Sequence, residues 1–450
     1  MPEPDESADL NLPDGAGCDE SEFDALTREV ARYRAVFDVT RALGGTLDLD
    51  QLLNLIIEKI TAVMDADRSS LFLIDWDTEE LWSKVAQGVR FLELRFPMNA
   101  GLAGAVATTG DCINIPDAYE DERFNQEWDK KTGYRTRSVL CVPMTNKAGD
   151  RIGVIQVLNK VAEGVFDDDD EEMLCALAGM IAVAVENSQL YEDQKKSFIS
   201  FVETLSTAMD ARDPITAGHS TRVTDYAVAI GEQLGYSEKQ LEVLNAATLM
   251  HDIGKIGVPE VVLFKDGRLD DEEYKIIQTH ALHTLNILDK IHFTRDFKGI
   301  PMMAATHHER IDGTGYPLGL RGEDIPEEGR VMAVADIFDA ITSRRHYRDR
   351  MNFGKVLRVL DEEAEGGHIQ HDFLAAFKAL PLTRIVAILE SDNTDTVPAE
   401  DMEKFGDYTL GYLQDVLEKD DSERSAEEKD LVVHFGCCYD RAAPTHGELD

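Results

Sequence analysis

Basic residues and long apolar runs are scarce in this 450-residue sequence. Lysine and arginine together number 45 against 87 aspartates and glutamates, so the formal net charge is −42. Binding to nucleic acid or to an anionic membrane is not expected, because both attract basic surfaces. No run of about 20 apolar residues is present, so no membrane insertion is expected. Hydrophobic residues still make up 43% of the chain, and its length favours two or three domains with buried cores.

Cysteines are also few, and their spacing gives no sign of a disulfide framework. The six cysteines are scattered, and no Cys-x-x-Cys pair occurs. Cys437 and Cys438 are adjacent and are poorly placed to cross-link a fold. Reduced thiols are therefore expected, and the acidic, proline-containing start differs from a targeting sequence. These features predict a cytoplasmic protein.

The N-terminal part of the chain predicts an α+β domain. Residues 1–34 begin as an acidic tail. Apolar residues then recur at helical spacing from Phe23 to Leu43. This helix either pairs with a partner helix or packs on its own domain. Residues 35–190 show a helical pattern, then several short apolar runs, then a second helical pattern. This order predicts an antiparallel sheet with flanking helices. The runs expected as strands are 70–75, 81–86, 112–116, 138–144 and 153–158.

The C-terminal part predicts helices. Residues 191–212 continue a helix that begins near residue 181. Its apolar spacing suits a parallel two-stranded coiled coil, and hence a homodimer, while a plain linker helix is the alternative. Residues 213–380 predict an all-α domain. Residues 381–450 are strongly acidic and predict a poorly ordered extension in which short helical pieces could dock.

Imidazole and carboxylate side chains are concentrated in the helical domain, each on or at the end of an apolar helix. They are His219, His251, Asp252, His280, His307, His308 and Asp336. Such ligands suit iron, manganese or zinc, and this set could hold two ions with positions left open for water or substrate. A structural zinc site would use cysteines, and none is near. The pattern predicts metal-assisted hydrolysis, although any single residue could instead be a buried polar group or an exposed helix residue.

Two segments of the α+β domain, 96–104 and 138–144, resemble GAF domains. A further motif resembles the GAF domains related to those of cyclic-nucleotide phosphodiesterases and cyclases; its residues are Asn159, Lys160, Phe166, Asp170 and Glu171. This resemblance implies binding of cAMP or cGMP, with the motif supporting the pocket rather than touching the ligand. The alternative is that Asn159 and Asp170 only cap a strand-to-helix turn beside an empty pocket.

The helical domain resembles the HD-GYP phosphodiesterases over residues 200–375. The resemblance rests on the seven candidate ligands and on the segments 251–257, 307–317 and 336–340. It implies hydrolysis of cyclic di-GMP to pGpG or GMP by a metal-activated hydroxide, with two divalent ions, iron or manganese. One ion would be held by His219, His251, Asp252 and Asp336, and Asp252 would bridge to a second held by His280, His307 and His308.

The same resemblance implies roles for residues around the ions. Lys255 would contact a phosphate oxygen or assist proton transfer, and with Asp252 it forms the expected catalytic pair. The substrate pocket would be shaped by the loop residues Asp312, Gly313, Gly315, Tyr316 and Pro317. Candidates for phosphate or guanine contacts, each equally consistent with a surface salt bridge, are Arg310, Lys265, Arg345 and Arg348.

The chain departs from the HD-GYP pattern at several positions. Ile215 stands where members with three metals carry a glutamate, which favours two ions. Ala281 and Thr284 replace the usual proline and glycine after His280, and residues 369–372 replace Phe-Asp-Pro. None of these departures removes a ligand. They bear on substrate preference and turnover rather than on metal binding.

Together these patterns predict a signalling enzyme in which a GAF sensor acts through a helix on a cyclic di-GMP phosphodiesterase. Two alternatives stay open. The first is a hydrolase of another cyclic dinucleotide or nucleotide, although the Gly-Tyr-Pro loop argues against a mononucleotide. The second is a cyclic di-GMP receptor without catalysis, and the intact ligand set argues against it.

Overall fold

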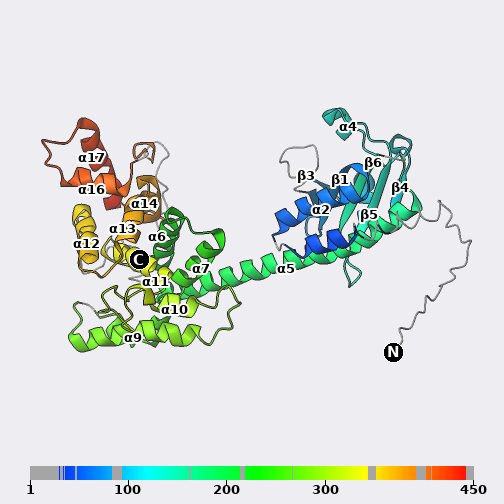
Figure 1. The fold of residues 1–450 in the computed structure, drawn as a ribbon. Helices are drawn as coiled ribbons and strands as arrows, with labels where there is room; N and C mark the ends of the chain where they lie inside the picture. The colour runs from blue at the N-terminus through cyan, green and yellow to red at the C-terminus, as the bar shows by residue number, and fades with distance from the viewer. Residues whose placement is uncertain are drawn as a thin grey trace, which may run out of the picture. The chain divides into compact units, whose positions relative to one another are not determined.

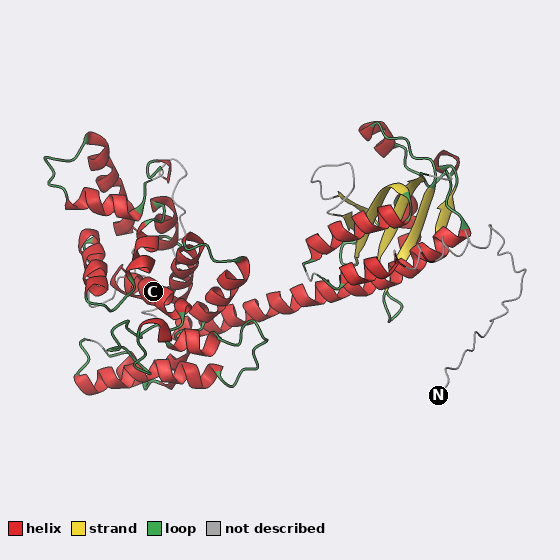
Figure 2. Ribbon diagram, in the orientation of Figure 1, coloured by secondary structure: helices red, strands yellow, loops and turns green. Residues whose placement is uncertain are grey.

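The chain folds into two units, each with its own core. The computed structural model describes residues 30, 34, 36–45, 48–83, 94–161, 164–212, 218–265, 267–342, 351–391, 402–406 and 408–441. The N-terminal unit is Met1–Lys196 and the C-terminal unit is Ser197–Asp450 (Figure 1). The first is built on a sheet and the second on helices (Figure 2). The predicted α+β domain followed by an all-α domain is therefore confirmed.

The N-terminal unit contains a six-stranded sheet in the order β3-β2-β1-β6-β5-β4, in which every pair is antiparallel. Its strands are β1 Ala66–Asp75, β2 Glu80–Ser83, β3 Leu94–Pro97, β4 Ile113–Ile115, β5 Val139–Thr145 and β6 Arg151–Lys160. Five strands lie where the sequence predicts them. The exception is β3, which is short, ends at a proline and lies at the sheet edge, where proline is tolerated.

Helices cover both faces of this sheet (Figure 2). On one face α2 (Leu49–Val63) and the first part of α5 (Asp168–Arg212) share a core that includes Ile56, Ile181 and Ile155. On the other face α3 (Gly101–Thr109) packs through apolar side chains such as Val106. The connection from β4 to β5 carries η1 (Ala118–Glu120) and α4 (Glu127–Thr132).

The helix predicted between Phe23 and Leu43 is described at residues 30, 34 and 36–43, all of which are helical. Val39 and Leu43 are buried in the same core as α2. In this part the helix packs on its own domain, which was one of the two alternatives.

The C-terminal unit is helical. Its elements are α6 His219–Gln233, α7 Glu238–Leu249, η2 Ile253–Gly257, α8 Glu260–Leu263, α9 Asp271–Leu288, α10 Ile300–Ala305, η3 Gly322–Asp324, α11 Glu327–Thr342, α12 Phe353–Glu365, α13 His371–Lys378, α14 Leu382–Leu389, α16 Leu410–Glu418 and α17 Ala426–Arg441. The rings of Tyr226 in α6 and Phe338 in α11 pack edge to face, with centroids 5.0 Å apart, and both are fully buried. This core fixes the helices that carry His219 and Asp336.

The structure corrects the expectation of a poorly ordered extension after residue 381. In the described part of that segment, α14, α16 and α17 join the main core of the unit through side chains that include Ile385, Leu413 and Phe435. Gln414 also donates a 2.6 Å hydrogen bond to Asp361 of α12. The acidic composition obscured apolar positions at helical spacing, which were the signal for packing.

The continuous helix predicted across residues 181–212 is confirmed, since α5 runs from Asp168 to Arg212. By length and composition alone, Asp168–Asp210 is the one described helix that could cross a membrane. Apolar side chains such as Leu177 and Ile181 are already buried against the sheet, as in the core helix of a globular domain. The absence of membrane insertion stays a prediction.

Candidate metal centre and ligand pocket

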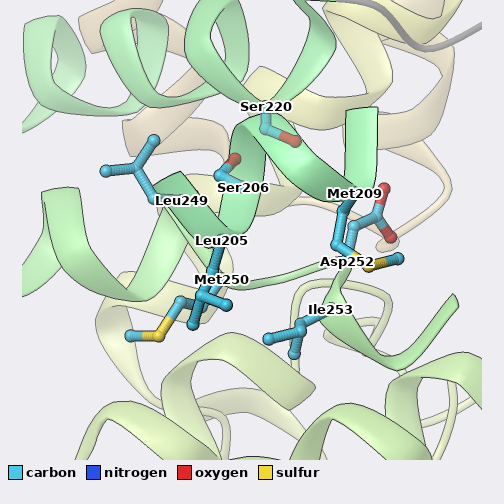
Figure 3. Close-up of a pocket in the computed structure, with 8 residues that line it drawn as sticks. All are labelled: Leu205, Ser206, Met209, Ser220, Leu249, Met250, Asp252 and Ile253. Carbon is cyan, nitrogen blue, oxygen red and sulfur yellow. The ribbon is translucent and has the colours of Figure 1, made fainter. Parts of the chain in front are cut away.

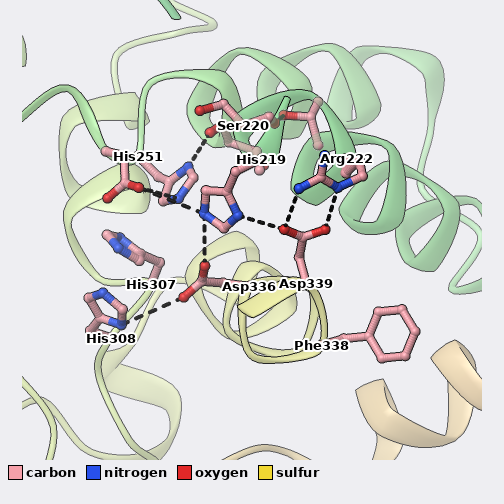
Figure 4. Close-up of polar contacts among 12 residues, drawn as sticks. His219, Ser220, Arg222, His251, His307, His308, Asp336, Phe338 and Asp339 are labelled. Atoms are coloured by element: carbon pink, nitrogen blue, oxygen red, sulfur yellow. Dashed lines mark hydrogen bonds and ion pairs between the residues drawn. The ribbon is translucent and has the colours of Figure 1, made fainter. Parts of the chain in front are cut away.

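Five helices of the C-terminal unit bring the predicted ligands to one place (Figure 4). His219 begins α6, His251 and Asp252 follow α7, His280 lies in α9, His307 and His308 follow α10, and Asp336 lies in α11. Six of these seven side chains are buried and His308 is half-buried. Polar groups this deep in a core need partners, because water cannot satisfy them.

The ligand atoms form two groups with Asp252 between them. The groups are His219, His251 and Asp252, and His280, His307 and His308, and within each group the atoms lie within 4.8 Å of one another. Asp252 Oδ2 lies 3.4 Å from His251 Nε2 and 3.7 Å from His219 Nε2. Its Oδ1 lies 3.4 Å from His280 Nε2. One carboxylate therefore faces both groups, as a bridging ligand would.

Backbone carbonyls orient three of the histidines. The Nδ1 atoms of His251, His280 and His307 lie 2.6, 2.7 and 2.7 Å from the carbonyl oxygen three residues earlier. An Nδ1–H donated to that carbonyl leaves the Nε2 lone pair facing the centre, the arrangement that metal-binding histidines use. The Nε2 of His251 is buried and makes no hydrogen bond within the described residues. A divalent ion would satisfy this nitrogen.

His219 is held by a carboxylate that the sequence analysis did not single out. Its Nδ1 lies 2.8 Å from Asp339 Oδ2, and its Nε2 lies 3.2 Å from Asp336 Oδ1 (Figure 4). Asp339 also accepts from Arg222 at 2.7 and 3.0 Å. Asp336 in turn lies 3.8 Å from His308 Nδ1. The signal for Asp339 was its position three residues after Asp336, on the same face of α11.

The histidine pKa values suit a metal site. Burial lowers the pKa of His280, and it lowers that of His307 well below the usual value. The pKa of His308 falls to about 3, again through burial. Burial also opposes the charged form of His219, but Asp336 and Asp339 outweigh it and raise its pKa to about 10. The imidazoles of His280, His307 and His308 are therefore neutral, as metal ligands must be. At His219, by contrast, a bound ion would replace a proton.

Lys255 is the cation nearest the bridging carboxylate. Its Nζ lies 2.5 Å from Asp252 Oδ2. Burial acts to raise the pKa of Asp252, yet the positive charge of Lys255 is the largest effect that holds it well below its usual value. Asp252 is therefore ionised, and the ammonium group stands beside the centre. The residues present fit two divalent ions with Lys255 at their edge.

The predicted substrate loop follows His308 and depends on two glycines. Gly313 has φ +80°, where glycine is favoured, and Asp312 accepts from the backbone N–H and the hydroxyl of Thr314. A Cβ on Gly315 would lie 2.3 Å from the backbone nitrogen of Arg310. The tight turn therefore requires glycine at position 315.

The end of the loop places an aromatic ring at the metal centre. The ring centroids of Tyr316 and His308 are 4.7 Å apart, and the Tyr316–Pro317 peptide is cis. Glu309, another residue that the sequence analysis did not assign, is buried and accepts from three backbone N–H groups in residues 318–320 at 2.6, 3.1 and 3.0 Å. Glu309 thus anchors the segment that follows the ring.

The departure at Thr284 is accommodated by a close helix contact. A Cβ on Gly254 would lie 1.9 Å from the carbonyl oxygen of His280, so η2 and α9 approach backbone to backbone. Thr284 Oγ1 donates to the His251 carbonyl at 2.8 Å and accepts from Gly254 N at 3.0 Å. The threonine therefore ties α9 to the turn that carries His251 and Asp252.

The remaining candidates for substrate contact are in salt bridges or outside the described residues. Lys265 lies 2.5 Å from Glu273, and Arg310 lies 3.8 Å from Glu363. The salt-bridge alternative therefore accounts for both side chains in this structure. Two further candidates, Arg345 and Arg348, fall outside the described residues. The same holds for Ile215, one of the departures from the HD-GYP pattern.

In the N-terminal unit, Asn159 does more than cap a turn. It has φ +56°, and its side chain accepts from Arg137 N at 2.6 Å. It also donates to the Arg135 carbonyl at 3.0 Å and to the Tyr134 hydroxyl at 2.8 Å. Asn159 therefore holds the 134–137 segment against the end of β6.

The other motif residues tie β6 to the start of α5. Lys160 Nζ lies 2.8 Å from Asp170 and donates to the Met64 carbonyl at 3.1 Å, and the buried Phe166 ring lies beside it. Asp170 N donates to the Asp167 side chain, and Glu171 N to the Asp167 carbonyl. These contacts are structural, as the resemblance implies.

A pocket of about 230 Å³ lies on the α3 side of the sheet. Five of its 17 lining residues are aromatic, among them Phe72, Phe96 and Trp128. Arg68 also lines it, and its guanidinium stacks 3.8 Å from the Tyr134 ring centroid. Within the described residues, the five motif side chains stay outside the lining, but Asn159 reaches it through Tyr134.

Residues 48–185 match the GAF domain family, and residues 203–372 match the HD domain family. The chain therefore contains a GAF domain followed by an HD domain. The 3'3'-cGAMP-specific phosphodiesterase 3 of Vibrio cholerae serotype O1 is 41% identical over 187 residues, which are 41% of this chain and 40% of that protein. The cyclic di-GMP phosphodiesterase of the same organism is 33% identical over 228 residues, 48% of this chain and 46% of that protein.

A dual 3',5'-cyclic-AMP and -GMP phosphodiesterase 11A of Takifugu rubripes is 38% identical over 189 residues. The match covers 39% of this chain and 21% of that protein. The chain thus spans less than half the length of each of these three relatives. Each of the three relatives is named as a phosphodiesterase of a cyclic nucleotide or a cyclic dinucleotide.

Replacing Asp339 by asparagine is expected to weaken metal binding. The substitution removes the charge that orients His219 and pairs with Arg222. Outer partners of metal ligands typically contribute about 10–100-fold in affinity. Titration of the full chain with Mn²⁺ measures the change, and the exposed Glu323→Gln in the same unit is the control. Equal affinity in the two variants would show that Asp339 does not support the centre.

Replacing Lys160 by methionine is expected to destabilise the GAF domain by about 3 kcal/mol, because it leaves the buried Asp170 carboxylate unpaired. Trp76, Trp82 and Trp128 all lie in this domain, so tryptophan fluorescence during denaturation of the full chain follows its unfolding. The control is Lys147→Met at an exposed position. A Lys160→Met transition that coincides with the control would contradict the expectation.

Proposed function

We propose that the chain is a metal-dependent phosphodiesterase that hydrolyses cyclic di-GMP to pGpG or GMP. The observation that carries this proposal is Asp252, which faces histidines of both groups while Lys255 lies 2.5 Å away. The relatives named as cyclic di-GMP and 3'3'-cGAMP phosphodiesterases support a cyclic dinucleotide as the substrate class.

The residues divide the work of the reaction. When bound, two divalent ions, iron or manganese, would supply Lewis acidity and a water of lowered pKa. The seven ligands would hold these ions. The groups that bind the Nδ1 atoms of the histidines keep the imidazole rings in the orientation that metal binding requires. Lys255 can donate to a phosphate oxygen beside Asp252. Tyr316, next to His308, offers a ring face on which a guanine can stack.

The main rival substrate is 3'3'-cGAMP, because the relative that is 41% identical is named as a 3'3'-cGAMP-specific phosphodiesterase. The test gives the Mn²⁺-loaded full chain cyclic di-GMP, 3'3'-cGAMP and cyclic di-AMP and compares kcat/KM. A preference of at least about tenfold for cyclic di-GMP, equivalent to about 1.4 kcal/mol, supports the proposal. A preference for 3'3'-cGAMP would show that this dinucleotide, and not cyclic di-GMP, is the substrate. Tight binding without turnover of any of the three would instead support a receptor.

We further propose that the GAF pocket binds a small anion with a planar purine ring, such as cAMP or cGMP. The aromatic lining can stack on a purine, and Arg68 can face a phosphate. Because Trp128 lines the pocket, titration of the full chain with each nucleotide should change tryptophan fluorescence. The same titration of Trp128→Phe should give a smaller change. No response to either nucleotide up to millimolar concentration would contradict the proposal.

Homodimerisation through α5 is part of this proposal. Leu190 and Phe201 are exposed by 53% and 56% and lie about three helical turns apart, on one face. Phe201→Glu is therefore expected to shift the full chain towards a monomer, as measured by light scattering, whereas Glu203→Gln should not. A chain that is monomeric from the start would contradict the dimer. A cytoplasmic location remains the expectation from composition.

A further inference from the structure

The last turns of α5 belong to the C-terminal unit and lie directly against the turn that carries Asp252. Leu205 and Met209 of α5 line a small pocket together with Leu249, Met250 and Asp252 (Figure 3). The pocket measures about 10 Å³, which leaves space for about one water. The end of α5 is therefore packed closely against the residues that precede and include the bridging carboxylate.

Asp210 follows in α5 and contacts the start of α6. Its Oδ1 accepts a 2.9 Å hydrogen bond from Ser220 Oγ. Ser220 is buried and comes directly after His219. The N-cap residue of α6 is Gly218, which has no side chain to cap the helix. The Asp210 carboxylate thus brings to this N-terminus the negative charge that helix starts favour.

The first turn of α6 is consequently held from two sides. On one side Asp339 of α11 binds His219 Nδ1 and Arg222 (Figure 4). On the other side Asp210 of α5 binds Ser220. The position of His219 relative to the rest of the centre depends on both contacts. Only the second contact comes from the helix that continues into the GAF domain.

We propose that Asp210 is a positioning residue that couples α5 to the metal centre. Through Ser220 it sets the first turn of α6 and hence the position of His219, so a displacement of α5 is transmitted to a metal ligand. The proposal rests on the proposed function for its effect on hydrolysis. Its effect on metal affinity stands independently, since Mn²⁺ binding needs no substrate.

The first test is Mn²⁺ titration of the full-length Asp210→Ala, Ser220→Ala and double variants. Each single variant should bind Mn²⁺ about tenfold more weakly, the size typical of groups that support metal ligands. The double variant should be no weaker than the singles, because both changes break one contact. Asp210→Asn, which keeps the acceptor oxygen, should retain part of the affinity, and the exposed Glu203→Gln on the same helix should match the wild type.

The second test measures transmission in the reverse direction. If α5 and the centre are coupled, metal binding must also stabilise the end of α5. Mn²⁺ should therefore slow amide hydrogen exchange in residues 205–210 of the wild type and have less effect in Ser220→Ala, whose α5 sequence is unchanged. Unchanged Mn²⁺ affinity in both single variants, or equal slowing in wild type and Ser220→Ala, would overturn the proposal. A wild type that binds Mn²⁺ but hydrolyses none of the cyclic dinucleotides would overturn the proposed function alone.

Discussion

The Asp252→Ala variant is expected to bind fewer metal ions than the wild type and to lose most of its hydrolytic activity. One oxygen of Asp252 lies near His219 and His251, and the other lies near His280, so both groups lose a ligand together. The substitution also leaves Lys255 Nζ without the carboxylate that lies 2.5 Å from it. Hydrolysis should fall by at least about 100-fold, the size associated with one group that stabilises a transition state.

Metal content by mass spectrometry and product chromatography measure this prediction on the same preparation. The wild type should carry about two ions per chain, and Asp252→Ala should carry fewer. The exposed Glu323→Ala in the same unit is the matched control and should behave as the wild type. An Asp252→Ala variant that keeps both ions and full turnover would show that the bridging role is wrong.

Gly254→Ala is expected to destabilise the HD domain by about 3 kcal/mol, at the upper end of the usual effect of overpacking. The added methyl group would lie 1.9 Å from the His280 carbonyl oxygen and 2.4 Å from Thr284 N. Both are backbone atoms, so neither can rotate away as a side chain could. The helix that carries His280 would have to move away from the turn that carries Asp252, and Mn²⁺ affinity should fall with stability.

Chemical denaturation followed by far-ultraviolet circular dichroism measures the loss of stability. The control is Gly436→Ala in α17. A Cβ at this position would meet nothing within 4 Å. Alanine is favoured over glycine in a helix by about 0.5–1 kcal/mol, so this variant should be as stable as the wild type or more stable. Similar stability of the two variants would contradict the close contact between η2 and α9.

The structure brings together the side chains selected from the sequence, which lie at helix ends or on apolar helix faces. A buried aspartate such as Asp336, on a helix of valines and alanines, requires a partner, and the histidines provide one. The residues that orient the ligands were less visible. Asp339 and Glu309 are ordinary acids in the sequence, and only the fold shows that they accept from His219 and from three backbone N–H groups.

Two parts of the fold were misjudged for physical reasons. The strand β3 is four residues long and ends in proline, so it lacks the alternation that identifies longer strands. The segment after residue 381 was judged by its charge, yet its helices bury Leu413 and Phe435 in the main core. Net charge describes the exposed face of a helix, whereas burial depends on the apolar face.

Anaerobic turnover after metal removal and reloading shows whether bound metal ions are required for hydrolysis of cyclic di-GMP. The full chain, stripped by a chelator and then given Fe²⁺ or Mn²⁺, is mixed with cyclic di-GMP, and the products are separated by chromatography. The stripped chain should give no product, and pGpG or GMP should appear after reloading, with no recovery in Asp252→Ala. Intact cyclic di-GMP after reloading with about two ions bound per chain would contradict the proposed function.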